Sequence, residues 1–279
     1  MTHQGVMLDP YRLDEWAAKV GMRPNALMQF EAWGKGVPTV RLAKVRSLGL
    51  RYHVTTWEPW SGKGDTSDTF SCANIAAGRH DAYIVAHAQA LASTNLWSEY
   101  LRFGHEMQGH WYPWSANPVA YVAAWRRVAD LVRAHCPSVR MLWSPNGNLY
   151  QDHATFMAVV RPYWPGKAYV DFVGITAINF TDRTPQQFGR RLLDMADSFG
   201  IAKVVLPEIN TRWDGRVEWL RAMRDWTVAN KARLQLAAVS QPEVSDGQAT
   251  IPSAGNMQWR VEDDPETRPV VREWFHALA

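Results

Sequence analysis

The sequence predicts an α/β fold in which eight parallel strands and eight helices alternate to form one closed (β/α)8 TIM barrel. Eight short apolar runs alternate along the chain with eight segments of helical spacing, and this order is typical of parallel α/β folds. The length of 279 residues is close to the roughly 250 residues that such a barrel needs. No linker or low-complexity tract divides the chain, so we expect a single domain over residues 1–279.

The short apolar runs are the predicted strands. Each is separated from the next by a helical segment, which favours parallel pairing over hairpins. In order they are Gly5–Leu8, Ala26–Phe30, Leu50–Thr56, Ser98–Phe103, Val139–Trp143, Phe172–Ala177, Lys203–Leu206 and Leu234–Val239.

Apolar stripes and end signals predict the helices. Leu13, Trp16 and Val20 recur on one helical face. Gly49 suits a helix end, and Asn117 is a candidate N-cap. After the first stripe, the helical segments are Pro38–Leu48, Asp81–Ala92, Pro118–Ala134, Ala154–Val160, Pro185–Phe199, Arg216–Asn230 and Pro265–Ala277.

The composition excludes several classes of function. The net charge of +3 is small and no basic run is present, so we expect no nucleic-acid partner. Two cysteines, Cys72 and Cys136, exclude a disulfide scaffold, and they are expected on opposite rims, unpaired. No window suits a membrane span and the first residues form no secretory signal. We expect a soluble monomer that acts outside a cell only if particle-borne, released by lysis or exported with a signal absent from this sequence.

The most informative segment is residues 102–114, Arg-Phe-Gly-His-Glu-Met-Gln-Gly-His-Trp-Tyr-Pro-Trp. It carries Glu106 from a predicted strand end into a loop that holds Trp111, Tyr112 and Trp114. Apolar walls raise the pKa of a carboxyl group, as a general acid near neutral pH requires. Aromatic rings are also the surfaces on which sugar rings stack.

A second acid, Glu208, follows the predicted strand Lys203–Leu206. The ends of the fourth and seventh strands face each other across the mouth of a barrel. Glu106 and Glu208 can therefore approach the roughly 5 Å separation of a retaining glycosidase. The sequence thus predicts cleavage of glycosidic bonds.

Residues 102–114 are open to two other interpretations. Glu106 could be a structural carboxylate that pairs with Arg102 or His105. A zinc site of the common helical type needs histidines at i and i+4, whereas His105 and His110 are one residue too far apart, in a segment broken by glycine and proline. We therefore expect no metal ion and no cofactor.

Polar and aromatic residues gather where the other predicted strands end, on the rim that carries the chemistry of such barrels. Many of the 15 tryptophans fall there, which favours a ligand surface over simple filling of the core. Glu58 suits a sugar ligand and a structural partner equally well. The predicted substrate-binding residues are His105, Trp111, Tyr112, Trp114, Trp57, Glu58, Trp60, Trp143, Asn146, Asn179, Phe180, Asn210 and Trp213.

Five segments, in order, resemble motifs of glycoside hydrolase family 26, the β-mannanase family of clan A. They are Trp57–Trp60, residues 102–114, Tyr121–Arg126, Leu142–Asn146 and Gln258–Val261. The resemblance implies a retaining endo-glycosidase that acts on a polysaccharide or oligosaccharide. It further implies Glu106 as acid/base and Glu208 as nucleophile, with His105 and Trp111 shaping the site.

The chain departs from the family pattern near both acids. Gln108 stands where the family has Asn, and Ile178 replaces a Tyr that contacts the nucleophile. Another donor must then hold Glu208, and Asn179 and Asn210 are the candidates.

The substrate stays open for a related reason. The eighth strand ends at Ser240 without the aromatic residue usual in the family, for which Trp213 is a candidate substitute. Mannan is the default substrate. Alternative substrates are mixed-linkage glucan, xylan or a bacterial envelope polysaccharide, and a particle-borne depolymerase is one form that such an enzyme can take. An alternative function is a catalytically inactive carbohydrate-binding barrel.

Overall fold

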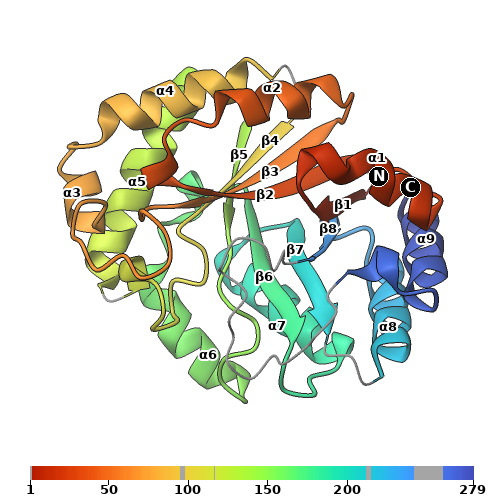
Figure 1. Cartoon of the computed structure of the whole chain (residues 1–279). Helices are drawn as coiled ribbons and strands as arrows, with labels where there is room; N and C mark the ends of the chain where they lie inside the picture. The colour runs from red at the N-terminus through yellow and green to blue at the C-terminus, as the bar shows by residue number, and fades with distance from the viewer. Residues whose placement is uncertain (1, 95–97, 116, 212–214, 242–259) are drawn as a thin grey trace.

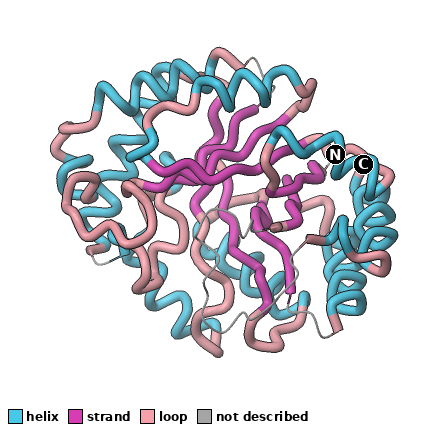
Figure 2. The backbone as a smooth tube through the Cα atoms, viewed as in Figure 1, coloured by secondary structure: helices cyan, strands magenta, loops and turns pink. Residues whose placement is uncertain are grey.

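The computed structural model describes residues 2–94, 98–115, 117–211, 215–241 and 260–279. Its strands close into a barrel in the order β1 to β8, all pairs being parallel. Helices surround the barrel on the outside (Figures 1 and 2). The predicted (β/α)8 fold is therefore confirmed.

The strands lie close to their predicted positions. Four of them, β2, β3, β6 and β7, run two to five residues further than their apolar runs suggest. The strands are β1 (His3–Met7), β2 (Ala26–Ala32), β3 (Tyr52–Glu58), β4 (Ser98–Phe103), β5 (Val139–Trp143), β6 (Phe172–Asn179), β7 (Val204–Thr211) and β8 (Leu234–Val239).

The helices also follow the prediction, with the short helix α3 as an addition. Asn117 caps α5 as expected, because its side chain accepts a hydrogen bond from the Ala120 N–H. The helices are α1 (Leu13–Val20), α2 (Thr39–Ser47), α3 (Cys72–Ala76), α4 (Asp81–Ala92), α5 (Pro118–His135), α6 (His153–Val160), α7 (Pro185–Phe199), α8 (Arg216–Ala229) and α9 (Thr267–Leu278).

The extension of β7 changes the position of one predicted catalytic residue. Glu208 was expected after the strand, but it lies inside β7, opposite Thr176 of β6. The register against β8 shifts between Leu206 and Ile209, around Pro207, which has no N–H to donate to a ladder. The apolar run does not reveal this extension, because Pro207 and the polar residues Glu208, Asn210 and Thr211 interrupt the apolar pattern.

The barrel interior is filled with side chains. Met7, Met28, Val54, Tyr100 and Leu142 belong to one buried cluster of strand residues, which closes the barrel as a packed core. A separate and larger cluster joins the outer faces of the strands to the helices. Both cysteines are buried and unpaired, and none of the described helices is long and apolar enough to span a membrane.

Candidate active site

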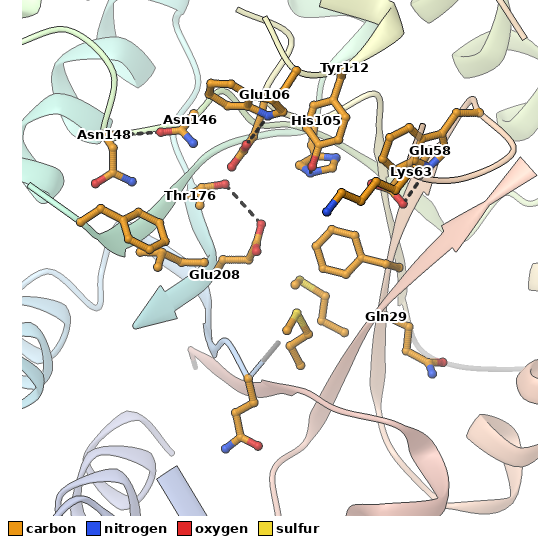
Figure 3. A pocket seen from close by; sticks show the side chains of 18 of the residues that line it. Gln29, Glu58, Lys63, His105, Glu106, Tyr112, Asn146, Asn148, Thr176 and Glu208 are labelled. Atoms are coloured by element: carbon orange, nitrogen blue, oxygen red, sulfur yellow. Dashed lines mark hydrogen bonds between the residues drawn. The ribbon is translucent and has the colours of Figure 1, made fainter. Parts of the chain in front are cut away.

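A cavity of about 640 Å³ opens at the carboxyl ends of the strands. Glu58, Glu106 and Glu208 line it together with amide, cationic and aromatic side chains (Figure 3). Met7 and Met28 form part of its floor, where the inner core of the barrel ends. The cavity thus lies on the rim that the sequence predicted.

The two predicted catalytic carboxylates meet in this cavity. Oxygen atoms of Glu106 and Glu208, together with a ring nitrogen of His105, all lie within 4.8 Å of one another. The carboxyl groups of Glu106, after β4, and Glu208, on β7, point toward one another (Figure 3). Retaining glycosidases hold their carboxyl groups about 5–5.5 Å apart, whereas inverting enzymes leave room for a water molecule between them.

Glu208 is held by a buried arginine. Arg102 Nη1 donates to Glu208 Oε1 at 2.5 Å, and the Thr176 hydroxyl donates to the same oxygen at 3.2 Å. Arg102 Nη2 also donates to Thr176 Oγ1 at 2.8 Å. Arg102 is fully buried on β4, so this ion pair is shielded from water.

The two asparagines proposed as holders of Glu208 have other partners. The Asn179 amide donates to Thr211 Oγ1 at 3.2 Å, and the Asn210 amide donates to the Ser240 carbonyl at 2.5 Å. Arg102 and Thr176 therefore replace them in that role. The reason is orientation: Thr176 lies opposite Glu208 in the β6–β7 ladder, whereas Asn179 lies opposite Thr211.

Glu106 is held in an unusual backbone conformation. Its φ of 52° lies in the left-handed region that non-glycine residues seldom adopt. Its N–H donates to the Ser144 carbonyl at 2.9 Å, and Trp111 Nε1 donates to its Oε2 at 3.2 Å. Burial raises the pKa of Glu106, and the negative charge of Glu208 raises it further, while Arg102 opposes them. A raised pKa keeps a carboxyl group protonated, as a general acid must be.

His105 supports the site as a neutral ring. Burial holds its pKa well below the ordinary value, and the charge of Arg102 adds to this effect. Its Nε2 lies 3.0 Å from the Tyr112 hydroxyl, and Trp114 Nε1 donates to its carbonyl at 2.7 Å. The Tyr112 and Trp114 rings stack at 4.3 Å. The aromatic loop thus fixes the residue next to Glu106.

Gln108, which departs from the family motif, holds the loop after β5. Its Nε2 donates to the Asn146 carbonyl at 2.8 Å, and its Oε1 accepts from the Asn146 N–H at 3.1 Å. The Asn146 side chain in turn accepts from the Asn148 N–H at 2.8 Å. The Gln108 side chain therefore holds Asn146, which lines the cavity, in place.

Glu58 is a third buried acid, at the end of β3. Burial, and then the charge of Glu208, raise its pKa to about 8. Trp60 Nε1 donates to its Oε2 at 3.2 Å. At pH 7 this carboxyl group is therefore largely protonated, and can both donate and accept hydrogen bonds with a sugar hydroxyl.

We expect Glu58→Gln to stabilise the protein at alkaline pH. Because the folded pKa of Glu58 is raised, its favourable contribution is complete below about 4.5 and is lost as the pH rises toward about 8. Glutamine does not ionise, so the variant should match the wild type at pH 5 and exceed its unfolding free energy by a few kcal/mol at pH 9. Thermal melts of both proteins at both pH values measure this. The same difference in melting temperature between variant and wild type at pH 5 and pH 9 would contradict it.

The structure divides the predicted substrate-binding residues into two groups. Trp57, Trp114 and Trp143 are fully buried and do not line the cavity, and neither do Asn179 and Asn210. Trp213 lies outside the described residues. Those that line the cavity are Glu58, Trp60, His105, Trp111, Tyr112, Asn146 and Phe180.

Sequence reasoning missed several groups at the site. Arg102 was predicted only as an alternative partner of Glu106, and no role was predicted for Thr176. The available signal was an arginine inside an apolar strand, four residues before Glu106, since a charge in such a place needs a buried partner. Arg41 and Lys63 also line the cavity, but neither belongs to a sequence motif that would have indicated this.

The donor atoms of His105, Glu106 and Glu208 are also close enough to surround a metal ion. Arg102 argues against such an ion, because its guanidinium already neutralises Glu208 at 2.5 Å. A divalent cation would have to share this small space with a buried positive charge.

A barrel with two facing carboxylates at its mouth defines the class of glycoside hydrolases that use paired acids. Residues 82–226 match the profile of Glycosyl hydrolase family 26. Because this match covers more than half of the 279 residues, the chain belongs to that family.

Two curated relatives are similar to parts of the chain. Endoglucanase H of Acetivibrio thermocellus is 28% identical over 165 residues, which is 56% of this chain and 16% of that protein. Mannan endo-1,4-beta-mannosidase A and B of Caldalkalibacillus mannanilyticus is 26% identical over 113 residues, 37% of this chain and 21% of that protein. The aligned regions therefore make up only 16% and 21% of these relatives' own length.

Solved structures share the fold. The GH26 domain of an endo-beta-mannanase/endo-beta-glucanase from Prevotella bryantii has a TM-score of 0.64 at 15% identity, covering 87% of this chain and 84% of that one. A GH5_18 protein from Streptomyces cattleya has a TM-score of 0.68 at 16% identity, covering 99% and 80%. At such identities the likeness concerns the barrel alone.

Proposed function

We propose that this protein is a retaining endo-glycosidase that hydrolyses a β-linked polysaccharide by double displacement. The observation that carries the proposal is the separation of Glu106 and Glu208, whose oxygens approach within 4.8 Å. Such a short separation suits the nucleophile and acid/base of a retaining enzyme. The two carboxyl groups of an inverting enzyme lie further apart because a water molecule must fit between them.

The surroundings of the two acids suit different roles. Glu106, with its raised pKa, is the acid that protonates the glycosidic oxygen. Glu208, which is paired with Arg102, attacks the anomeric carbon and forms a glycosyl-enzyme. Glu106, now deprotonated, takes a proton from the water that attacks this intermediate, and Glu208 is released.

Mannan is the first substrate to test, because one relative is named a mannan endo-1,4-beta-mannosidase. A β-glucan is the second, because another relative is named an endoglucanase. Ile178 stands on the cavity wall where the family pattern has a tyrosine, so a different glycan, such as xylan or a bacterial envelope polysaccharide, belongs in the same test.

The test measures new reducing ends after the purified protein is incubated with mannan, galactomannan, mixed-linkage glucan, xylan and bacterial envelope polysaccharides. We expect release from one glycan and none with Glu208→Ala. A rapid fall in polymer length at low conversion would show endo action. Retained configuration in the first product, observed by NMR, would support the double displacement, and inversion would contradict it. If no glycan yields new reducing ends but the protein binds to a glycan array, the result would instead favour a carbohydrate-binding barrel.

A further inference from the structure

One end of the cavity reaches the surface beside β1 and β2. Asp9, in the loop after β1, and Arg41, on α2, line this end. Asp9 is partly exposed, and the Arg41 side chain is 37% exposed. A glycan chain longer than the catalytic cleft can leave the cavity here.

Tyr11 lies next to this opening and is 63% exposed. Among the described residues, the large hydrophobic side chains that are exposed are Tyr11, Val40, Trp111 and Val119. Trp111 lines the cavity, and Val40 directly precedes Arg41. Tyr11 is likewise two residues from Asp9, whereas Val119 lies near the start of α5.

The backbone of Tyr11 is held in a defined turn. It belongs to the short 3-10 turn η1 (Pro10–Arg12), which Asp9 caps: the Tyr11 N–H donates to Asp9 Oδ1 at 2.9 Å. Arg12 anchors the other end of the turn by donating to Glu262 at 3.1 Å. The Lys44 ammonium lies 5.4 Å from the centre of the Tyr11 ring. A residue whose backbone is already ordered loses less conformational freedom on binding than one in an unanchored loop.

Polar groups beside the ring can bind sugar hydroxyls. The Asp9 carboxylate accepts hydrogen bonds, and Arg41 keeps further donors after Nη1 has donated to Glu31 at 3.1 Å. An aromatic platform flanked by a few polar groups is the usual composition of a small-molecule site.

We propose that Tyr11, with Asp9 and Arg41, forms a distal subsite that binds a pyranose ring of a long glycan outside the catalytic cleft. The inference rests on the proposed function, because it takes the ligand to be a continuation of the substrate chain. It adds a length dependence: polymers engage this subsite, whereas the shortest substrates do not reach it.

The kinetic test compares the polymer with the shortest oligosaccharide that the wild type cleaves. We expect Tyr11→Ala to raise KM for the polymer roughly fivefold to tenfold, with kcat unchanged and the short substrate unaffected. Tyr11→Phe should behave as the wild type. The matched control is Tyr169→Ala: Tyr169 also lies beneath a cation, Arg126, at 5.3 Å, but precedes β6 at the opposite rim. Equal effects on both substrates, or no effect, would overturn the inference.

A second test needs no turnover. Glu208→Gln protein, with and without Tyr11→Ala, is run in gels that contain galactomannan, mixed-linkage glucan or xylan. Retardation by one glycan that falls when Tyr11 is replaced supports the subsite. Retardation independent of Tyr11, or none in any gel, contradicts it. The wild type can release no reducing ends while the Glu208→Gln protein shows retardation that depends on Tyr11. In that case the proposed function fails and the subsite stands.

Discussion

Glu208→Ala is expected to lower kcat by several orders of magnitude, on the order of 10⁴-fold or more. Without this carboxylate no glycosyl-enzyme can form, and Arg102 is left buried without its counter-charge. Azide should restore part of the rate and give a glycosyl azide of opposite anomeric configuration, because a small anion can attack from the vacated side. Full activity in Glu208→Ala, or rescue without inversion, would exclude Glu208 as the nucleophile.

Glu106→Ala should give a different pattern. An aryl glycoside with a good leaving group needs little protonation, so formation of the intermediate should be much less impaired on it than on the natural glycan. Hydrolysis of the intermediate still needs a base, so we expect a burst of released phenol followed by slow turnover. An equal loss on good and poor leaving groups would contradict the acid/base role.

The fold could be predicted from the sequence because every strand of a parallel barrel is separated from the next by a helix. This alternation survives errors in individual boundaries. The predicted ends of strands were wrong where a strand continues into polar residues. β7 continues through Glu208 to Thr211, although its apolar run ends at Leu206.

The burial of the tryptophans shows a second limit. Neighbouring residues on a strand point to opposite faces. Because Glu58 lines the cavity, Trp57 must face the helices, where it stacks on His87 at 4.3 Å. Adjacent motif residues were assigned to one surface because motif matching ignores this alternation. Once Glu58 is assigned to the cavity, the alternation of a strand places Trp57 in the core.

The partner of Glu208 could not be predicted from the sequence for a different reason. Arg102 and Glu208 are separated by 106 positions in the chain, and their contact depends on the diameter and register of the closed barrel. The position of each acid follows from local patterns, whereas the pairing of Arg102 with Glu208 is a property of the assembled strands.

Arg102→Met is therefore expected to have a large effect on both stability and activity. Removing one partner of a buried ion pair leaves the other charge uncompensated, which costs about 3–5 kcal/mol of unfolding free energy. Arg102 bonds both Glu208 and Thr176, so kcat should fall as well. Because Arg102 lowers the pKa of Glu106, its removal should move the alkaline limb of the pH–rate profile to higher pH.

A double-mutant cycle separates this role from simple packing. In Arg102→Met/Glu208→Gln neither charge is buried alone, so denaturant unfolding should show that most of the stability lost in Arg102→Met returns. Arg102→Lys keeps the charge but cannot bind Glu208 and Thr176 with one planar group. It should therefore fold better than Arg102→Met, keep a wild-type alkaline limb and still lose kcat. Additive losses of stability in the cycle, with an unshifted alkaline limb in Arg102→Met, would show that Arg102 only fills space, because a charge that holds Glu208 must couple to it energetically.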